Sequence, residues 1–163
     1  MIINNVKLVL EDDVVQGSLE IEGGVIRAFA ESPSSLPEAL DGEGGWLLPG
    51  LIELHTDNLD KFFTPRPKVD WPAHSAMSSH DALMVASGIT TVLDAVAIGD
   101  VRDGGDRLEN LEKMINAVEE TQKRGVNRAE HRLHLRCELP HHTTLPLFEK
   151  LVGREPVTLS LLY

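Results

Sequence analysis

The chain has 163 residues, of which 42% are hydrophobic, and its formal net charge is −11 at pH 7. This length is that of one ordinary domain or of part of a larger protein, and the hydrophobic fraction is sufficient for a folded core. The acidic balance argues against binding to nucleic acid or to an anionic membrane, since both need a basic surface. A few local Lys and Arg side chains could still hold an anionic small molecule.

Cysteine usage and hydropathy exclude further classes. Cys137 is the only cysteine, so there is no intrachain disulfide and no paired-cysteine metal site. No apolar run reaches the roughly 18 residues of a membrane-spanning helix, and residues 1–6 lack the basic and apolar regions of a signal peptide. We expect a soluble, cytoplasmic protein that binds neither nucleic acid nor membrane.

The first 48 residues have the pattern of a small β domain. Three short strands rich in Ile, Val and Leu are expected at residues 2–10, 14–21 and 25–30. They predict an antiparallel meander. Pro, Gly, Ser and acidic residues over 31–45 indicate a connecting loop, and a strand from Trp46 leads into the next segment.

From residue 49 onward, strands and helices alternate. Further strands are expected at 89–96, 132–139 and 157–162, and helices at 79–87, 106–124 and 145–152. A long loop with three prolines is expected after Asp60. This alternation predicts an α/β fold with a parallel sheet.

The number of units indicates an incomplete barrel. Three strand–helix units and the start of a fourth make half of a (β/α)8 barrel, which needs roughly 250 residues when whole. The chain also ends within an apolar strand, at residues 161–163. We therefore expect residues 1–48 to form a small antiparallel β domain that missing C-terminal strands would complete. Residues 49–163 are expected to form the truncated first half of the barrel.

The apolar run at residues 48–54 leads into His55 and Asp57. On a strand, two residues that are two positions apart leave on the same face. An imidazole and a carboxylate on one face at the end of a strand can bind a divalent cation. A buried strand with a merely polar exit is the alternative, and the pattern leaves both open.

Apolar and polar side chains alternate in the strand at 132–139. The apolar set is Leu133, Leu135, Cys137 and Leu139, and the polar set is His134, Arg136 and Glu138. On a barrel strand the apolar set would pack against helices and the polar set would line the interior, where unpaired polar groups are costly. Glu138 is either an ion-pair partner of Arg136 or a metal-binding carboxylate at the strand end, where barrel active sites are built. His141 and His142 lie just beyond it.

Basic side chains gather in the segment after Asp60, at Lys61, Arg66 and Lys68. They form either an ordinary charged surface or a clamp on phosphate oxygens, for which Lys supplies a point charge and Arg a bidentate fork.

Three other polar residues have simpler expected roles. His74 and His80 lie in or just after the Pro-containing loop, and we expect them to be solvated. Asp94 lies near a strand end, where it is expected to hydrogen-bond loop backbone. No P-loop and no GxSxG motif is present, so hydrolysis by metal-activated water is the best-supported chemistry.

Several segments together resemble a known family. Leu-Pro-Gly-Leu-Ile-Glu-Leu-His at 48–55 and Gly-Ile-Thr-Thr-Val-Leu-Asp at 88–94, following a short β meander, are similar to the amidohydrolase superfamily. The segments at 55–60, 76–83 and 134–139 more closely resemble the PhnM family, the hydrolases of the carbon–phosphorus lyase pathway. The likeness extends to about residue 158.

This resemblance implies a metal-dependent diphosphatase of phosphonate catabolism. Its substrate would be α-D-ribose 1-methylphosphonate 5-triphosphate, which is split into the 5-phosphate and diphosphate. The resemblance further implies that His55 is the first histidine of a His-x-His metal pair, that Asp57 replaces the second, and that Glu138 supplies a metal-bridging carboxylate. Such an oxygen-rich site leaves Zn²⁺, Mn²⁺ and Mg²⁺ as candidate cofactors.

The remaining roles stay open. Candidate substrate-binding residues are Lys61, Arg66, Lys68 and Arg136. The resemblance places the general base and further ligands in a C-terminal half that is absent here, so we expect the chain to be inactive alone. One alternative is an amidohydrolase acting on a cyclic amide or an N-acetyl group. Another is a non-catalytic half-barrel that associates with another chain or with itself as a homo-oligomer.

Overall fold

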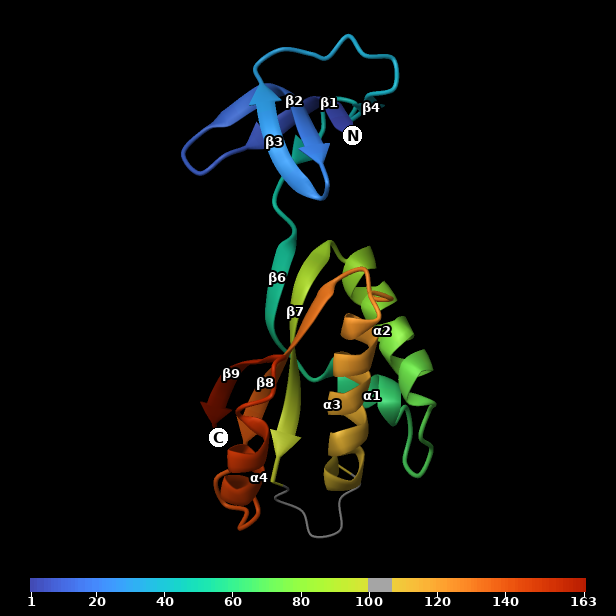
Figure 1. The fold of residues 1–163 in the computed structure, drawn as a ribbon, viewed down its shortest axis with the longest axis vertical. Helices are drawn as coiled ribbons and strands as arrows, with labels where there is room; N and C mark the ends of the chain where they lie inside the picture. The colour runs from blue at the N-terminus through green and yellow to red at the C-terminus, as the bar shows by residue number, and fades with distance from the viewer. Residues whose placement is uncertain (100–106) are drawn as a thin grey trace. The chain divides into compact units, whose positions relative to one another are not determined.

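The computed structural model describes residues 1–99 and 107–163 (Figure 1). These residues form two compact units, Met1–Pro49 and Gly50–Tyr163. In the part of the chain that is described, no helix is long and apolar enough to cross a membrane.

The first unit is a small β-sheet. Its strands are β1 (Ile2–Val9), β2 (Val14–Glu22), β3 (Val25–Ala30), β4 (Leu40–Asp41) and β5 (Trp46–Leu47). The three long strands form the predicted antiparallel meander, and the two short strands pair parallel to β1. Gly23 and Gly24 adopt φ values of 59° and 78° at the hairpin turn, a conformation that glycine enters without steric cost. The buried core is small, with Val6, Leu8 and Leu19 at its centre, and β3 is exposed along its whole length.

The second unit is an α/β structure with a four-stranded parallel sheet, in the order β6-β7-β8-β9. The strands are β6 (Leu51–Thr56), β7 (Ile89–Ile98), β8 (Glu130–Cys137) and β9 (Val157–Leu162). The helices are α1 (Asn58–Phe63), α2 (Ala73–Ala86), α3 (Arg107–Lys123) and α4 (Thr144–Leu151). This confirms the predicted α/β class and the parallel sheet.

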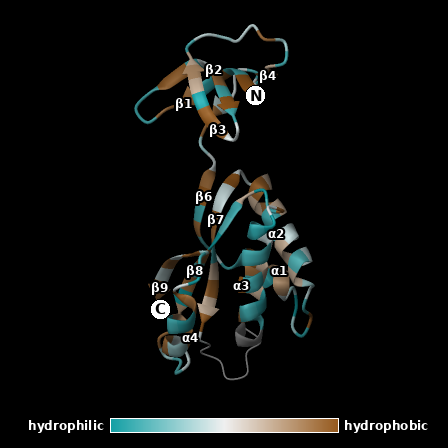
Figure 2. Cartoon of the chain, in the orientation of Figure 1, coloured by the Kyte–Doolittle hydropathy of each residue, from teal (hydrophilic) through white to brown (hydrophobic). Residues whose placement is uncertain are grey.

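One hydrophobic core joins the helices to one face of this sheet. Side chains from β7, β8 and all four helices contribute to the cluster, among them Val96, Leu133, Met77, Ile115 and Leu151. Figure 2 shows hydrophilic residues along much of the visible side of α3, as expected for a helix whose other side packs inward.

Strand β8 alternates largely as predicted. Leu133, Leu135 and Cys137 are buried in the helix-facing core, which confirms their predicted packing. Leu139, by contrast, is 59% exposed, because β8 ends at Cys137 and the chain leaves the sheet before reaching it. The alternation places His134 and Arg136 on the opposite face of the sheet.

The structure corrects two expectations about elements. The loop predicted to follow Asp60 is shorter than expected, because helix α1 continues to Phe63 and helix α2 begins at Ala73 rather than near Ser79. Helix α1 packs through its buried residues Leu59 and Phe63. Pro72 precedes α2, a place where proline is compatible with the start of a helix. The strand expected from Trp46 is two separate strands, β5 and β6, which belong to different units.

Candidate metal centre

His55 and Asp57 lie where β6 ends and α1 begins. His55 is the penultimate residue of the strand, and Asp57 immediately precedes the helix. The Nε2 atom of His55 is 3.8 Å from Oδ2 of Asp57. The side chains are 33% and 47% exposed, respectively, so a small ligand could reach both from solvent. The two residues are therefore close enough to bind one cation together.

Arg136 links this pair to Glu138. Its Nη1 donates to Oδ1 of Asp57 at 2.7 Å, and its Nε donates to Oε1 of Glu138 at 2.9 Å. The ion pair between Arg136 and Glu138 that the sequence left open is thus present. We call His55, Asp57, Arg136 and Glu138 the strand-end cluster, since they come from the carboxyl-terminal ends of β6 and β8 and the residues that follow.

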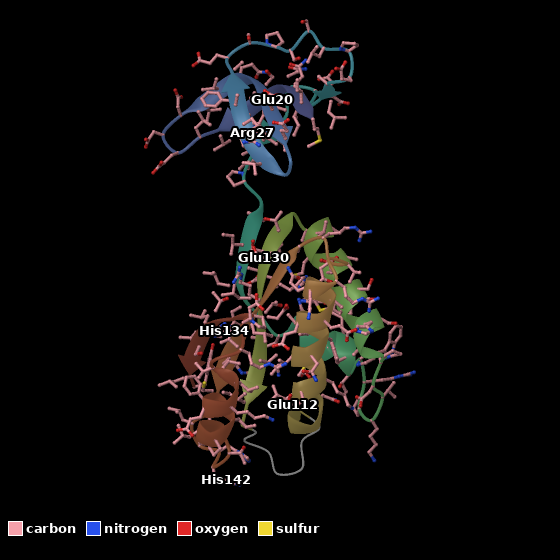
Figure 3. The ribbon with its side chains drawn as sticks, viewed as in Figure 1. Glu20, Arg27, Glu112, Glu130, His134 and His142 are labelled. Carbon is pink, nitrogen blue, oxygen red and sulfur yellow. The ribbon has the colours of Figure 1, made fainter. Side chains whose placement is uncertain are left out.

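His134, labelled in Figure 3, lies on β8. It is fully buried and adjoins His55 of this cluster. Its Nδ1 is 3.1 Å from the backbone carbonyl of Leu54, while its Nε2 is buried with no hydrogen-bond partner. Its ring meets the ring of His55 edge-on, with centroids 4.8 Å apart. Burial lowers the pKa of His134, which favours the neutral imidazole. The sequence placed His134 in the polar set of this strand but assigned it no ligand role.

The three basic residues after β6 stay apart from the strand-end cluster. Lys61 is in α1 and donates to Oδ1 of Asn58 at 3.3 Å. Arg66 and Lys68 are exposed in the following loop, where Lys68 has a φ of 63°. Among the contacts described, none joins these three side chains to Asp57, Arg136 or Glu138. Their proposed role in substrate binding stays a prediction.

A second polar group lies under α2, on the helix-facing side of the sheet. Asp94 on β7 contacts Nε2 of His80 at 2.5 Å through Oδ1 and Nδ1 of His131 at 2.8 Å through Oδ2. Nε2 of His131 is 3.2 Å from Oδ1 of Asp81, which also accepts hydrogen bonds from the backbone N–H groups of Arg128 and Ala129. All four side chains are buried. We call His80, Asp81, Asp94 and His131 the buried network.

The buried network corrects two expectations. His80 is not solvated but fully buried, because it lies on the side of α2 that packs against the sheet, where it contacts Asp94 of β7. Asp94 does not bond loop backbone, since β7 continues to Ile98 and leaves Asp94 in mid-strand between two histidines. A sequence signal for the buried network was present: Asp94 lies within an apolar strand, and His131 lies at the start of the next strand in the chain.

Charge distribution in the buried network favours a structural role. Burial alone would lower the pKa of His131, but the carboxylates of Asp94 and Asp81 outweigh it and raise this pKa. Burial would likewise raise the pKa of Asp81, yet the two backbone N–H groups and His131 lower it. His80, Asp94 and His131 have ligand atoms within 4.8 Å of one another. Both Asp94 oxygens, however, are already within hydrogen-bond distance of an imidazole nitrogen. The three side chains are therefore arranged to bond to one another rather than to a metal ion.

The fold and the strand-end side chains define an α/β protein with polar groups gathered at the ends of parallel strands. The structure resembles that of a D-hydantoinase from Bacillus sp. AR9, with a TM-score of 0.55 and 19% sequence identity, over 98% of this chain and 32% of that one. It also resembles an uncharacterized protein, with a TM-score of 0.52 and 17% identity over 87% of this chain and 34% of that one. These likenesses show the fold.

Sequence comparison adds a much closer relative. The chain is 92% identical over 159 residues to alpha-D-ribose 1-methylphosphonate 5-triphosphate diphosphatase of Escherichia coli (strain K12). This confirms the resemblance to the phosphonate-pathway hydrolases. The match covers 98% of this chain and 42% of the relative, so the chain spans less than half the length of that protein. No protein-family model matches the chain.

Proposed function

We propose that this chain is part of a metal-dependent diphosphatase that acts on α-D-ribose 1-methylphosphonate 5-triphosphate. The observation that carries the proposal is the 92% identity over almost the whole chain to the diphosphatase of that name. The products would be the 5-phosphate and diphosphate, and the role would be phosphonate catabolism. The fold shared with a D-hydantoinase supports a hydrolase scaffold of the amidohydrolase type, with a barrel that this chain begins.

The residues at the ends of β6 and β8 fit a divalent cation. His55 offers an imidazole nitrogen, and Asp57 and Glu138 offer carboxylate oxygens, a set that suits Zn²⁺, Mn²⁺ or Mg²⁺. The buried, unpartnered Nε2 of His134 is a further observation that fits a cation at this place. When bound, such a cation acts as a Lewis acid toward phosphoryl oxygens.

The chain's own residues would position the substrate. Arg136 is held by Asp57 and Glu138, and its planar fork matches a phosphate geometrically. Lys61 lies one helical turn beyond Asp57, and Arg66 and Lys68 follow in the exposed loop. We propose that these basic groups offset the negative charge of the triphosphate. In an acidic chain of net charge −11, local positive groups are needed for that.

We propose that diphosphate release requires residues in addition to those of this chain. A site with His55, Asp57 and Glu138 as ligands, two of them ion-paired to Arg136, is open, so the chain alone should release negligible diphosphate. The first unit, Met1–Pro49, supports the same view, because its core cluster has only three buried apolar side chains and strand β3 is exposed. We propose that further strands complete it.

Complementation tests this function. The purified chain is mixed with a separately produced polypeptide that carries the part of the E. coli relative not covered by the match. Diphosphate release from the ribose methylphosphonate triphosphate is then measured with Zn²⁺, Mn²⁺ or Mg²⁺. We expect turnover in the mixture, none with either part alone, and none with Asp57→Asn. Hydrolysis of a cyclic amide in place of the triphosphate would overturn the proposal and favour amidohydrolase activity.

A second candidate is a non-catalytic half-barrel that pairs with another copy of itself. It is favoured by the apolar side chains of strand β6, where Leu51, Ile52 and Leu54 are each 60–62% exposed, and by Leu162 of β9, which is 70% exposed. Exposed apolar strands at the sides of a sheet tend to pair. Sedimentation of the chain over a range of concentrations tests this candidate, and a monomer at all concentrations would contradict it.

A further inference from the structure

We propose that His134 is an additional ligand of the divalent cation and that it binds through Nε2 beside His55 and Asp57. This inference rests on the metal site of the proposed function and extends it to a residue whose ligand role neither the sequence pattern nor the comparisons assign.

The first support is an irregularity in β6. Glu53 pairs with Val92 and Thr56 pairs with Asp94, so β6 uses three steps where β7 uses two. Such a bulge inserts one unpaired residue and redirects neighbouring groups, and bulges are common beside active sites. The carbonyl of Leu54 lies within this irregular stretch, where it faces Nδ1 of His134 at 3.1 Å. The bulge therefore ties β6 to a side chain of β8, a strand that is not its neighbour in the sheet.

The hydrogen bond to Leu54 determines which nitrogen of His134 is available. A carbonyl oxygen only accepts, so Nδ1 must carry the proton that is donated to it. In the neutral ring, Nε2 then bears a lone pair. A charged ring would instead bury an unpaired N–H donor, which is the costlier arrangement. Metal-binding histidines typically hold their second ring nitrogen in this way, by donating it to a backbone carbonyl.

The environment of Nε2 points to a missing partner. His134 is fully buried, and Nε2 makes no hydrogen bond to the described protein atoms. Buried polar atoms without a partner are rare and call for an explanation such as an ion or an ordered water. The neighbouring ring is that of His55, 4.8 Å away between centroids, and His55 in turn is 3.8 Å from Asp57. A cation shared by His55, Asp57 and His134 would satisfy Nε2 and use three side chains that already lie together.

Metal affinity tests the inference directly. The 163-residue chain, its His134→Gln variant and its His74→Gln variant are titrated with Zn²⁺ in competition with a chromogenic chelator. His74 is the matched control, because it is an exposed histidine of α2 paired with Glu120 at 3.1 Å and lies outside the site. We expect His134→Gln to lower the Zn²⁺ affinity by about 100-fold. This is the upper end of the loss in metal affinity seen when residues that support metal ligands are replaced. His74→Gln should leave the affinity unchanged.

Nuclear magnetic resonance of the ¹⁵N-histidine-labelled wild-type chain provides a measurement that needs no substitution. On addition of Zn²⁺, Nε2 of His134 should move from the resonance of an unprotonated nitrogen to that of a metal-bound one, while Nδ1 stays protonated. This readout decides the matter even where His134→Gln fails to fold, as judged by circular dichroism.

The outcomes separate this inference from the proposed function. Tight Zn²⁺ binding by the wild-type chain with an unmoved Nε2 resonance, or with equal affinity in His134→Gln, would overturn the role of His134 and leave the rest of the metal site standing. An ordered water on Nε2 would then explain the buried atom. Absence of Zn²⁺ binding by the wild-type chain would overturn both the inference and the metal site on which it rests.

Discussion

The buried network and the strand-end cluster both combine histidine with acidic side chains, but they differ in how far their polar atoms are already engaged. In the buried network under α2 the two carboxylates are fully engaged, since both oxygens of Asp94 contact an imidazole and Asp81 accepts from His131 and from backbone N–H groups, while Nδ1 of His80 has no partner among the described atoms. The strand-end cluster on the opposite face is partly open, with Asp57 47% exposed and the neighbouring Nε2 of His134 unpartnered. Carboxylates that are buried and fully engaged predict a role in stability, whereas a partly exposed carboxylate beside an unpartnered imidazole nitrogen predicts a role in binding.

The largest expected effect concerns the buried network. Asp94→Asn removes the carboxylate that two buried imidazoles share, and breaking a buried charge pair costs about 3–5 kcal/mol. We expect this loss in the free energy of unfolding, measured with urea and followed by circular dichroism. Asp57→Asn at the partly exposed cluster should cost far less. A similar loss of stability in both variants would contradict the distinction between the two groups.

The next effect concerns the support of Asp57. Arg136→Met removes the guanidinium that holds Oδ1 of Asp57 at 2.7 Å and the carboxylate of Glu138 at 2.9 Å. We expect Zn²⁺ affinity to fall about tenfold, the lower end for loss of a partner that orients a ligand. The measurement is the same chelator competition. A rise in affinity would instead show that Arg136 competes with the cation for the two carboxylates.

A smaller effect is the pH dependence of the stability that the buried network contributes. His131 is faced by Asp94 from β7 and by Asp81 and His80 from α2, and its pKa is raised above 6.5 in the folded chain. Its protonation therefore stabilises the fold fully below pH 6.5, and this contribution is lost as the pH rises through the folded pKa. The lowered pKa of Asp81 acts in the opposite sense, since its contribution is present above pH 3.8 and lost as the pH falls through the folded value.

Urea unfolding at a series of pH values measures this dependence. Asp81→Asn removes one of the carboxylates that raise the pKa of His131, so the decline of stability above pH 6.5 should be smaller and should end at a lower pH in the variant. Superimposable profiles for the two proteins above pH 6.5 would contradict the contribution of Asp81 to the raised pKa of His131.

The smallest expected effect lies outside both groups. Lys61→Ala removes an exposed side chain whose described hydrogen bond is a 3.3 Å contact with Asn58. Surface substitutions of this kind change the free energy of unfolding by at most about 0.5 kcal/mol, and Zn²⁺ affinity should stay the same. Inorganic triphosphate, followed by calorimetry, should bind a few-fold more weakly. An unchanged triphosphate affinity would remove Lys61 from the proposed substrate site.

Short-range patterns explain what could be predicted. The alternation of Leu133, Leu135 and Cys137 with polar neighbours identified β8 and its helix-facing side, because side chains leave a strand on alternating faces whatever the surrounding fold. The spacing of His55 and Asp57 predicted that they lie together on one face of a strand; they are 3.8 Å apart, but Asp57 follows the strand and precedes α1. α1 was missed because its six residues are too few to display a helical period, and packing of Leu59 and Phe63 stabilises it instead.

Patterns in the sequence predicted the α/β class, the parallel sheet and polar residues at the ends of β6 and β8. How those residues pair is visible only in the three-dimensional arrangement. Whether Arg136 holds Asp57, whether His80 is buried, and which nitrogen of His134 is left free all depend on contacts between residues 14 to 80 positions apart. Local sequence patterns carry no information on such distances, because the register between elements and the bulge in β6 set them.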